Sequence, residues 1–154
     1  MMNEDRNFQF QHTDTRAARI KELVQANRTG ITPQALMTLE NTLNKVWTRY
    51  GIYFVLTGTH VIERLPREEH QQSPITLHEL TRIFMEFTRK YSWYFARLPV
   101  EAETYGVIKE PFSQINVGFV VRPGVGISGY PRDLMLQTIL RKREFSTRNR
   151  IFEV

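Results

Sequence analysis

The chain has 154 residues, 41% of them hydrophobic, and carries a net charge of +5 with no cysteine. This size suits one ordinary core and is too small for two domains, and the lack of cysteine excludes disulfides, Cys-rich zinc sites and thiol nucleophiles. No run is long and apolar enough to cross a bilayer, and the N-terminus is polar where a secretory signal would be apolar. We therefore expect a cytoplasmic protein that makes no membrane contact.

Basic residues gather toward the C-terminus. From residue 141 onward, five Lys or Arg stand against two Glu. A block of this kind favours an anionic partner, and nucleic acid is favoured over anionic lipid because no amphipathic membrane helix accompanies the block. The alternative is a solvated surface that only keeps the protein soluble.

The N-terminal third is predicted to be mostly helical. Residues 1–13 are polar and predict a flexible arm. Apolar residues at helical spacing follow over 14–30. A second helix is predicted to begin at Pro33, because Thr32 is a suitable N-cap and proline is favoured at the first helical position, and to end at Gly51.

The middle of the chain changes from strand to helix. The apolar, β-branched run 52–56 predicts a strand, and the small residues after it lead into a short helix near His60. Residues 66–74 are polar and predict a loop. Thr76 and Glu79 then form a capping box, which predicts the start of an amphipathic helix.

The last third predicts strands at 105–108, 115–121 and 133–140, joined by turns rich in glycine and proline. Helices first and strands second are typical of an α+β domain. We expect residues 14–154 to form one such domain, with N-terminal helices packed on a twisted antiparallel sheet of about four strands and with a basic C-terminal segment.

The first candidate site is the predicted helix at His60. His60, Arg64 and Arg67 lie at i, i+4 and i+7, so their side chains project from one face. Histidine transfers protons near neutral pH, and arginine donates paired hydrogen bonds to phosphoryl oxygens, which suits cleavage or binding of a phosphodiester. The alternative is that His60 caps the helix and Arg64 pairs with Glu68.

The second candidate is the end of the last predicted strand. Alternation places Arg141 and Arg143 on one face and Lys142 on the other, so at least one cation lies beside whatever the sheet presents. A basic strand end that only aids solubility is the alternative. Tyr130, in a glycine-rich turn, is a candidate for stacking on an unpaired base.

Metal ions and cofactors are not predicted. The histidines lack the His-Glu-x-x-His run of a zinc helix, although several carboxylates lie near them in the sequence. The glycines at 124–126 lack the Lys and Ser or Thr of a phosphate-binding loop.

The order of elements in this chain resembles that of the small phage endoribonucleases of the RegB type. The resemblance consists of the run His60-x-x-Glu63-Arg64 after a strand, the capped helix that follows, the strand 116–121 and a final strand that ends in 141–143. The RegB-type enzymes belong to the phage branch of the barnase, colicin and RelE nuclease superfamily. The resemblance covers roughly residues 52 to 147. It implies a RelE-like fold and metal-independent RNA cleavage that leaves a 2′,3′-cyclic phosphate.

The resemblance implies that His60 and Arg64 of this chain correspond to the family's first catalytic histidine and to its arginine one turn later. The family carries a second catalytic histidine on the next helix, where this chain has Arg82 with His78 nearby. Either His78 or Arg82 takes this role, or the activity has been lost.

Three functions are therefore predicted. The first is a phage-type endoribonuclease that cleaves single-stranded RNA by 2′-hydroxyl attack. In the first function His60, Arg64, His78 and Arg141 are the catalytic candidates, and the RNA-binding candidates are Arg67, Arg82, Tyr130, Lys142 and Arg143. The second is an inactive RNA-binding or regulatory module. The third is a structural or adaptor protein of a virion, with a phage or host protein partner.

Overall fold

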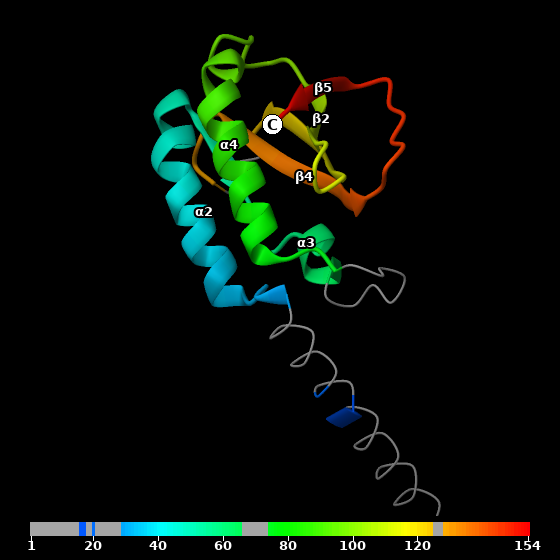
Figure 1. Cartoon of the computed structure of the whole chain (residues 1–154). Helices are drawn as coiled ribbons and strands as arrows, with labels where there is room; N and C mark the ends of the chain where they lie inside the picture. The colour runs from blue at the N-terminus through cyan, green and yellow to red at the C-terminus, as the bar shows by residue number, and fades with distance from the viewer. Residues whose placement is uncertain (1–15, 18–19, 21–28, 66–73, 125–127) are drawn as a thin grey trace, which may run out of the picture.

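The computed structural model describes residues 16–17, 20, 29–65, 74–124 and 128–154. The elements in chain order are α2 (Pro33–Trp47), the 3-10 turn η1 (Thr48–Tyr50), β1 (Ile52–Val55), α3 (His60–Arg64), α4 (Leu77–Ala96), β2 (Thr104–Glu110), β3 (Ile115–Pro123), β4 (Arg132–Arg141) and β5 (Arg150–Glu153) (Figure 1). The arm predicted at 1–13 and most of the helix predicted at 14–30 lie outside the described residues.

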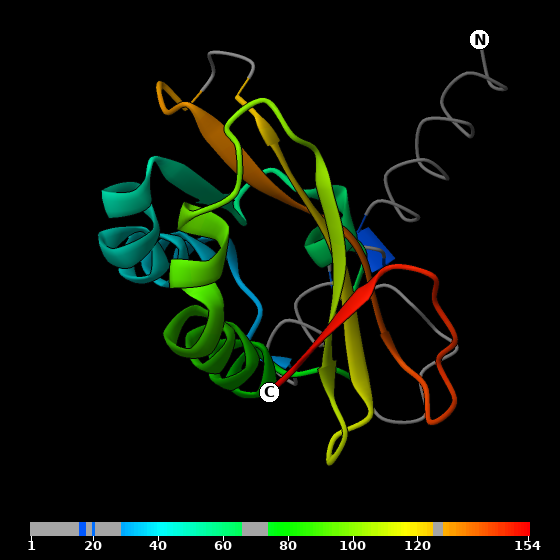
Figure 2. The ribbon, with the colours of Figure 1, turned by 90° about the horizontal axis from the view of Figure 1, so that it is seen from above.

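The described chain has the predicted α+β architecture. The strands form one sheet in the order β1-β4-β3-β2-β5, and α2 and α4 lie together on one side of it (Figure 2). The expected sheet of about four antiparallel strands is wrong in two respects, because the sheet has five strands and is mixed. β1 pairs with β4 in parallel, and β2 pairs with β5 in parallel.

The direction of β1 follows from its connection. Parallel neighbours need a long crossover, and the chain between β1 and β4 supplies one that includes both α3 and α4. β5 was not predicted, because its four residues alternate too briefly for a periodic signal. The connection at 142–149 passes on the side of the sheet away from α2 and α4 (Figure 2).

Both long helices begin as the sequence predicts. The Thr32 hydroxyl accepts a hydrogen bond from the Ala35 N–H at 3.1 Å. Gly51 follows η1 with a φ of 71°, a left-handed conformation that favours glycine. In α4 the Thr76 hydroxyl and the Glu79 carboxylate complete the capping box.

Aromatic rings fill the space between the helices and the sheet. The largest buried members are Trp47, Phe54, Phe84, Phe87, Phe95, Phe119 and Phe152. The Trp47 indole N–H donates to the Thr88 hydroxyl at 2.8 Å, so this buried polar group is satisfied. Burial of one such side chain contributes roughly 1.5–3 kcal/mol, so the cluster anchors both helices to the sheet.

The position of α3 follows from the direction of β1. Because β1 and β4 run parallel, the chain that leaves β1 moves toward the carboxyl end of β4, and α3 contacts that strand. Ile62 on α3 and Leu65, which follows the helix, are buried in the core. This packing turns His60 and Arg64 toward solvent.

Candidate functional site

The first candidate site, the outer face of α3, is open to solvent. The His60 side chain is 84% exposed, and its Nδ1 lies 3.8 Å from a carboxylate oxygen of Glu63. Arg64 is exposed, and its side chain makes no hydrogen bond or ion pair with any other described residue. Arg67 and Glu68, which were predicted to extend or to neutralise this face, lie outside the described residues.

A buried carboxylate on α2 holds the turn that leads into α3. Glu40 is 6% exposed, and one of its oxygens accepts from the backbone N–H groups of Leu56 and Thr57 at 2.7 and 2.6 Å. Its other oxygen accepts from the Tyr53 hydroxyl at 2.7 Å. Glu40 therefore fixes the backbone from which His60 projects.

The donors around Glu40 keep it ionised. Burial by itself raises the pKa of Glu40, but hydrogen bonds from Thr57, Tyr53 and Leu56 outweigh the burial and lower it. Burial and the adjacent Glu40 carboxylate raise the pKa of Tyr53 to about 12. The Tyr53 hydroxyl is therefore a permanent donor at neutral pH.

Sequence reasoning did not identify Glu40. A signal was present, since Glu40 lies at i+4 from Leu36 and at i−3 from Leu43 on the buried stripe of α2. A charged residue on an apolar stripe indicates a buried polar contact.

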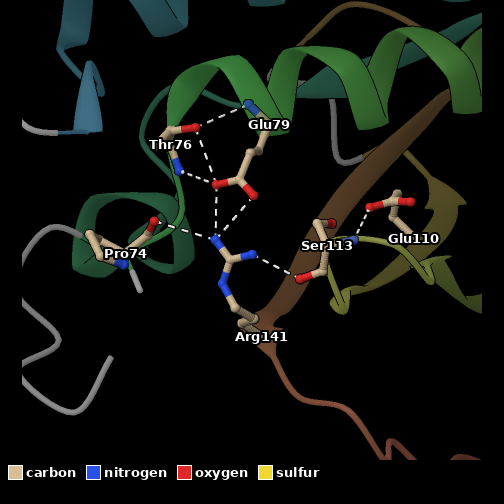
Figure 3. Close-up of polar contacts among 6 residues, drawn as sticks. All are labelled: Pro74, Thr76, Glu79, Glu110, Ser113 and Arg141. Atoms are coloured by element: carbon tan, nitrogen blue, oxygen red, sulfur yellow. Dashed lines mark hydrogen bonds and ion pairs between the residues drawn. The ribbon is translucent and has the colours of Figure 1, made fainter. Parts of the chain in front are cut away.

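The second candidate site lies where α4 begins and β4 ends (Figure 3). One guanidinium nitrogen of Arg141 donates to both carboxylate oxygens of Glu79, at 2.9 and 3.1 Å, and to the Pro74 carbonyl at 3.4 Å. The other terminal nitrogen donates to the Ser113 carbonyl at 2.8 Å. The Arg141 and Glu79 side chains are only 22% and 25% exposed. Arg141, a predicted catalytic residue, thus joins three segments of the fold.

Glu79 is ionised in this arrangement. Burial raises its pKa, but the hydrogen bond from Arg141 and the backbone hydrogen bond from Thr76 outweigh that effect and lower it. Glu79 therefore neutralises Arg141 while it caps α4.

We name this region the α4–β4 corner and define it by the Glu79–Arg141 pair and the exposed residues of the same segments: His78, Arg82, Lys142 and Arg143. His78 and Arg82 lie one turn apart on α4, beside Glu79. Lys142 and Arg143 directly follow Arg141. The structure thus brings four predicted functional residues together with Arg141.

Tyr130 lies away from the α4–β4 corner. It precedes β4, whereas Lys142 follows it, and the ten residues of that strand span roughly 30 Å. The Tyr130 ring stacks on Tyr53 with centroids 5.7 Å apart, and the residue is 38% exposed. One face of the ring is therefore already covered.

The part of the chain that the structure describes contains no cluster of three or more His, Cys, Asp or Glu residues that could hold a metal ion. Among the described helices none has the length and apolar character to span a membrane. Comparison with protein-family models, curated proteins and solved structures gave no match. The likeness to RegB-type nucleases therefore stays a prediction.

Replacing Glu40 by Gln is expected to lower the free energy of unfolding by about 2 kcal/mol at pH 7, because an amide cannot accept from all of these donors. The folded-state pKa of Glu40 is lowered, so its contribution is present above the ordinary value of 4.5 and is lost as the pH falls through the folded-state pKa. The difference in free energy of unfolding between wild type and E40Q, measured by urea unfolding, should therefore become smaller as the pH falls from 6 to 3. A difference that stays constant across this range would contradict the assignment.

Replacing Arg141 by Met is expected to lower the free energy of unfolding by about 1–2 kcal/mol, since Glu79 and the Ser113 carbonyl lose a shared donor in a partly exposed pair. Arg141→Lys should recover only part of this, because an ammonium group lacks the planar fork that reaches several acceptors. Arg143→Met is the matched control, and its exposed side chain should change stability by less than about 0.5 kcal/mol. Equal urea midpoints for R141M and R143M would show that the Glu79 pair is not structural.

Proposed function

We propose that this protein binds single-stranded RNA and that the α4–β4 corner holds the phosphate backbone through Arg82, Lys142 and Arg143. The observation that carries the proposal is that Lys142 has a fixed main chain and an exposed side chain. Its N–H donates to the Gln114 carbonyl at 2.8 Å, and its carbonyl accepts from the Asn116 side-chain amide at 3.1 Å.

A fixed main chain favours binding of a polyanion. The cations at 142 and 143 extend from a segment that is already ordered, so less conformational freedom is lost when a phosphate binds. Arg82 presents a further cation from α4. Arg141 is left out of the phosphate-binding set because Glu79 neutralises it.

Charge supports an anionic ligand, and the resemblance supports RNA. The chain carries a net charge of +5, and its C-terminal segment supplies a large share of it. Phosphate contacts of this kind do not distinguish RNA from DNA. The choice of RNA depends on the likeness to RegB-type nucleases, and competition with DNA of the same sequence tests it.

Neutralising Arg82, Lys142 and Arg143 together to Gln should weaken binding of a single-stranded RNA about tenfold or more near 0.1 M salt. The slope of log affinity against log salt should fall by about 2, since each lost phosphate contact on a single strand contributes about 0.7. Fluorescence anisotropy over a range of salt concentrations measures both quantities.

The matched control removes the same number of charges at exposed positions elsewhere: Lys45, Arg49 and Arg97. Equal losses in the two triple variants would mean that net charge alone drives binding. Binding by wild type that does not depend on salt would overturn the proposal.

Cleavage of the bound RNA is a second candidate function, and the exposed face of α3 favours it. His60 accepts the proton of a ribose 2′-hydroxyl as the 2′-oxygen bonds to phosphorus, and Glu63 stabilises the imidazolium that results. Arg64 donates to the phosphoryl oxygens as negative charge develops, the bond between phosphorus and the 5′-oxygen breaks, and the departing 5′-oxygen takes a proton from water. The 84% exposure of His60 leaves its ring accessible to a substrate.

His60→Ala should lower RNA cleavage by two or more orders of magnitude and change RNA affinity less than twofold. The assay is done with a chelator present and identifies the 3′ ends, where a 2′,3′-cyclic phosphate is expected. His78→Ala is run in parallel, because His78 is the alternative second histidine. Equal cleavage by wild type and H60A would remove His60 from the mechanism.

A further inference from the structure

Phe112 is exposed to an unusual degree for its type. It lies in the turn between β2 and β3, and 91% of its surface is accessible. Every other large hydrophobic residue in the described ranges is less exposed. An aromatic side chain that makes no use of its apolar surface within the fold is a candidate for contact with a ligand.

The turn that presents Phe112 is held in place from several sides. The Glu110 carboxylate accepts from the N–H groups of Phe112 and Ser113 at 3.0 and 2.5 Å. The Ser113 carbonyl accepts from Arg141 at 2.8 Å, and the Gln114 carbonyl accepts from the Lys142 N–H at 2.8 Å. The ring is therefore displayed by an ordered backbone that is hydrogen-bonded to Arg141 and Lys142 of the α4–β4 corner.

Two cations lie near the turn that carries the ring. Burial raises the pKa of Glu110, but hydrogen bonds from Ser113 and Phe112 and the positive charge of Arg82 outweigh the burial and lower it, so Arg82 of α4 lies near the turn. Lys142 is bonded to the turn from the β4 side. An exposed ring on a turn near cations is an arrangement with which proteins stack an unpaired base while they hold the neighbouring phosphates. An apolar partner protein would instead favour further apolar residues around the ring.

We infer that Phe112 stacks on an unpaired base of the single-stranded nucleic acid held at the α4–β4 corner. The inference rests on the proposed function and adds a residue that the sequence alone did not single out. It also gives the site a preference for single strands, because the bases of a duplex are stacked on one another and are not free to stack on Phe112.

The test compares wild type with the variants Phe112→Ala, Phe112→Leu and Phe112→Tyr. Anisotropy is measured with a fluorescent single-stranded RNA, with the same RNA as a duplex, and with a strand that carries abasic residues. F112A and F112L should each bind the single strand about fivefold more weakly or worse, whereas F112Y should stay within twofold of wild type. The salt slope should not change, because no charge is removed. Thermal unfolding should also be nearly unchanged, because Phe112 is 91% exposed and little of its surface is buried in the fold.

The outcomes separate the inference from the proposed function. Wild type that does not bind RNA removes both. If wild type binds RNA in a salt-dependent way and F112A binds the same RNA with equal affinity, only the stacking role of Phe112 is removed. Retained affinity in F112L would show that apolar area suffices and would overturn stacking. A loss in F112A that persists on the abasic strand would also overturn it, because no base is then available to the ring.

Discussion

One carboxylate, that of Glu79, joins parts of the chain that are far apart in sequence. It completes the capping box of α4 with Thr76, and it binds Arg141, 62 residues later, at the end of β4. Arg141 in turn holds the turn at Ser113. The hydrogen bonds from Arg141 and Thr76 outweigh the burial of Glu79 and lower its pKa, so the carboxylate stays charged for both partners at neutral pH. The arrangement of the α4–β4 corner depends on this interaction.

Glu40 holds the segment that leads into α3, just as Glu79 holds the α4–β4 corner. It also accepts from backbone N–H groups and from a side-chain donor, and it fixes the turn before α3. The two segments that carry the predicted functional residues are thus each held by an ionised carboxylate whose partners lie on different elements. The exposed cations and histidines on these segments can therefore be replaced with little effect on stability, because the backbone that carries them is held by these two carboxylates.

Local signals in the sequence predicted much of the fold. Thr32 and Pro33, the capping box at Thr76 and the β-rich composition of the longer strands are local signals, and the structure confirms the two helix starts and the strands. The parallel pairing of β1 with β4 and of β5 with β2 was not predictable in this way, because strand direction is decided by the path of the connections. The site shows the same limit. The sequence predicts a catalytic role for Arg141 and RNA binding for Lys142 and Arg143, but only the tertiary structure shows that Arg141 is paired with Glu79 while its two neighbours are exposed.

The parallel pairing of β1 with β4 also affects the order in which the protein folds. The Arg132 guanidinium at the start of β4 donates to the Tyr50 carbonyl just before β1, across 82 residues of chain. During synthesis β1 has no strand to pair with until β4 has left the ribosome, whereas α2 and α4 leave the ribosome earlier and can pack together before that. Closing so large a loop is slow because its entropy is lost before the contact is gained. β1 is therefore an unpaired strand in the nascent chain, protected from other chains mainly by its short length.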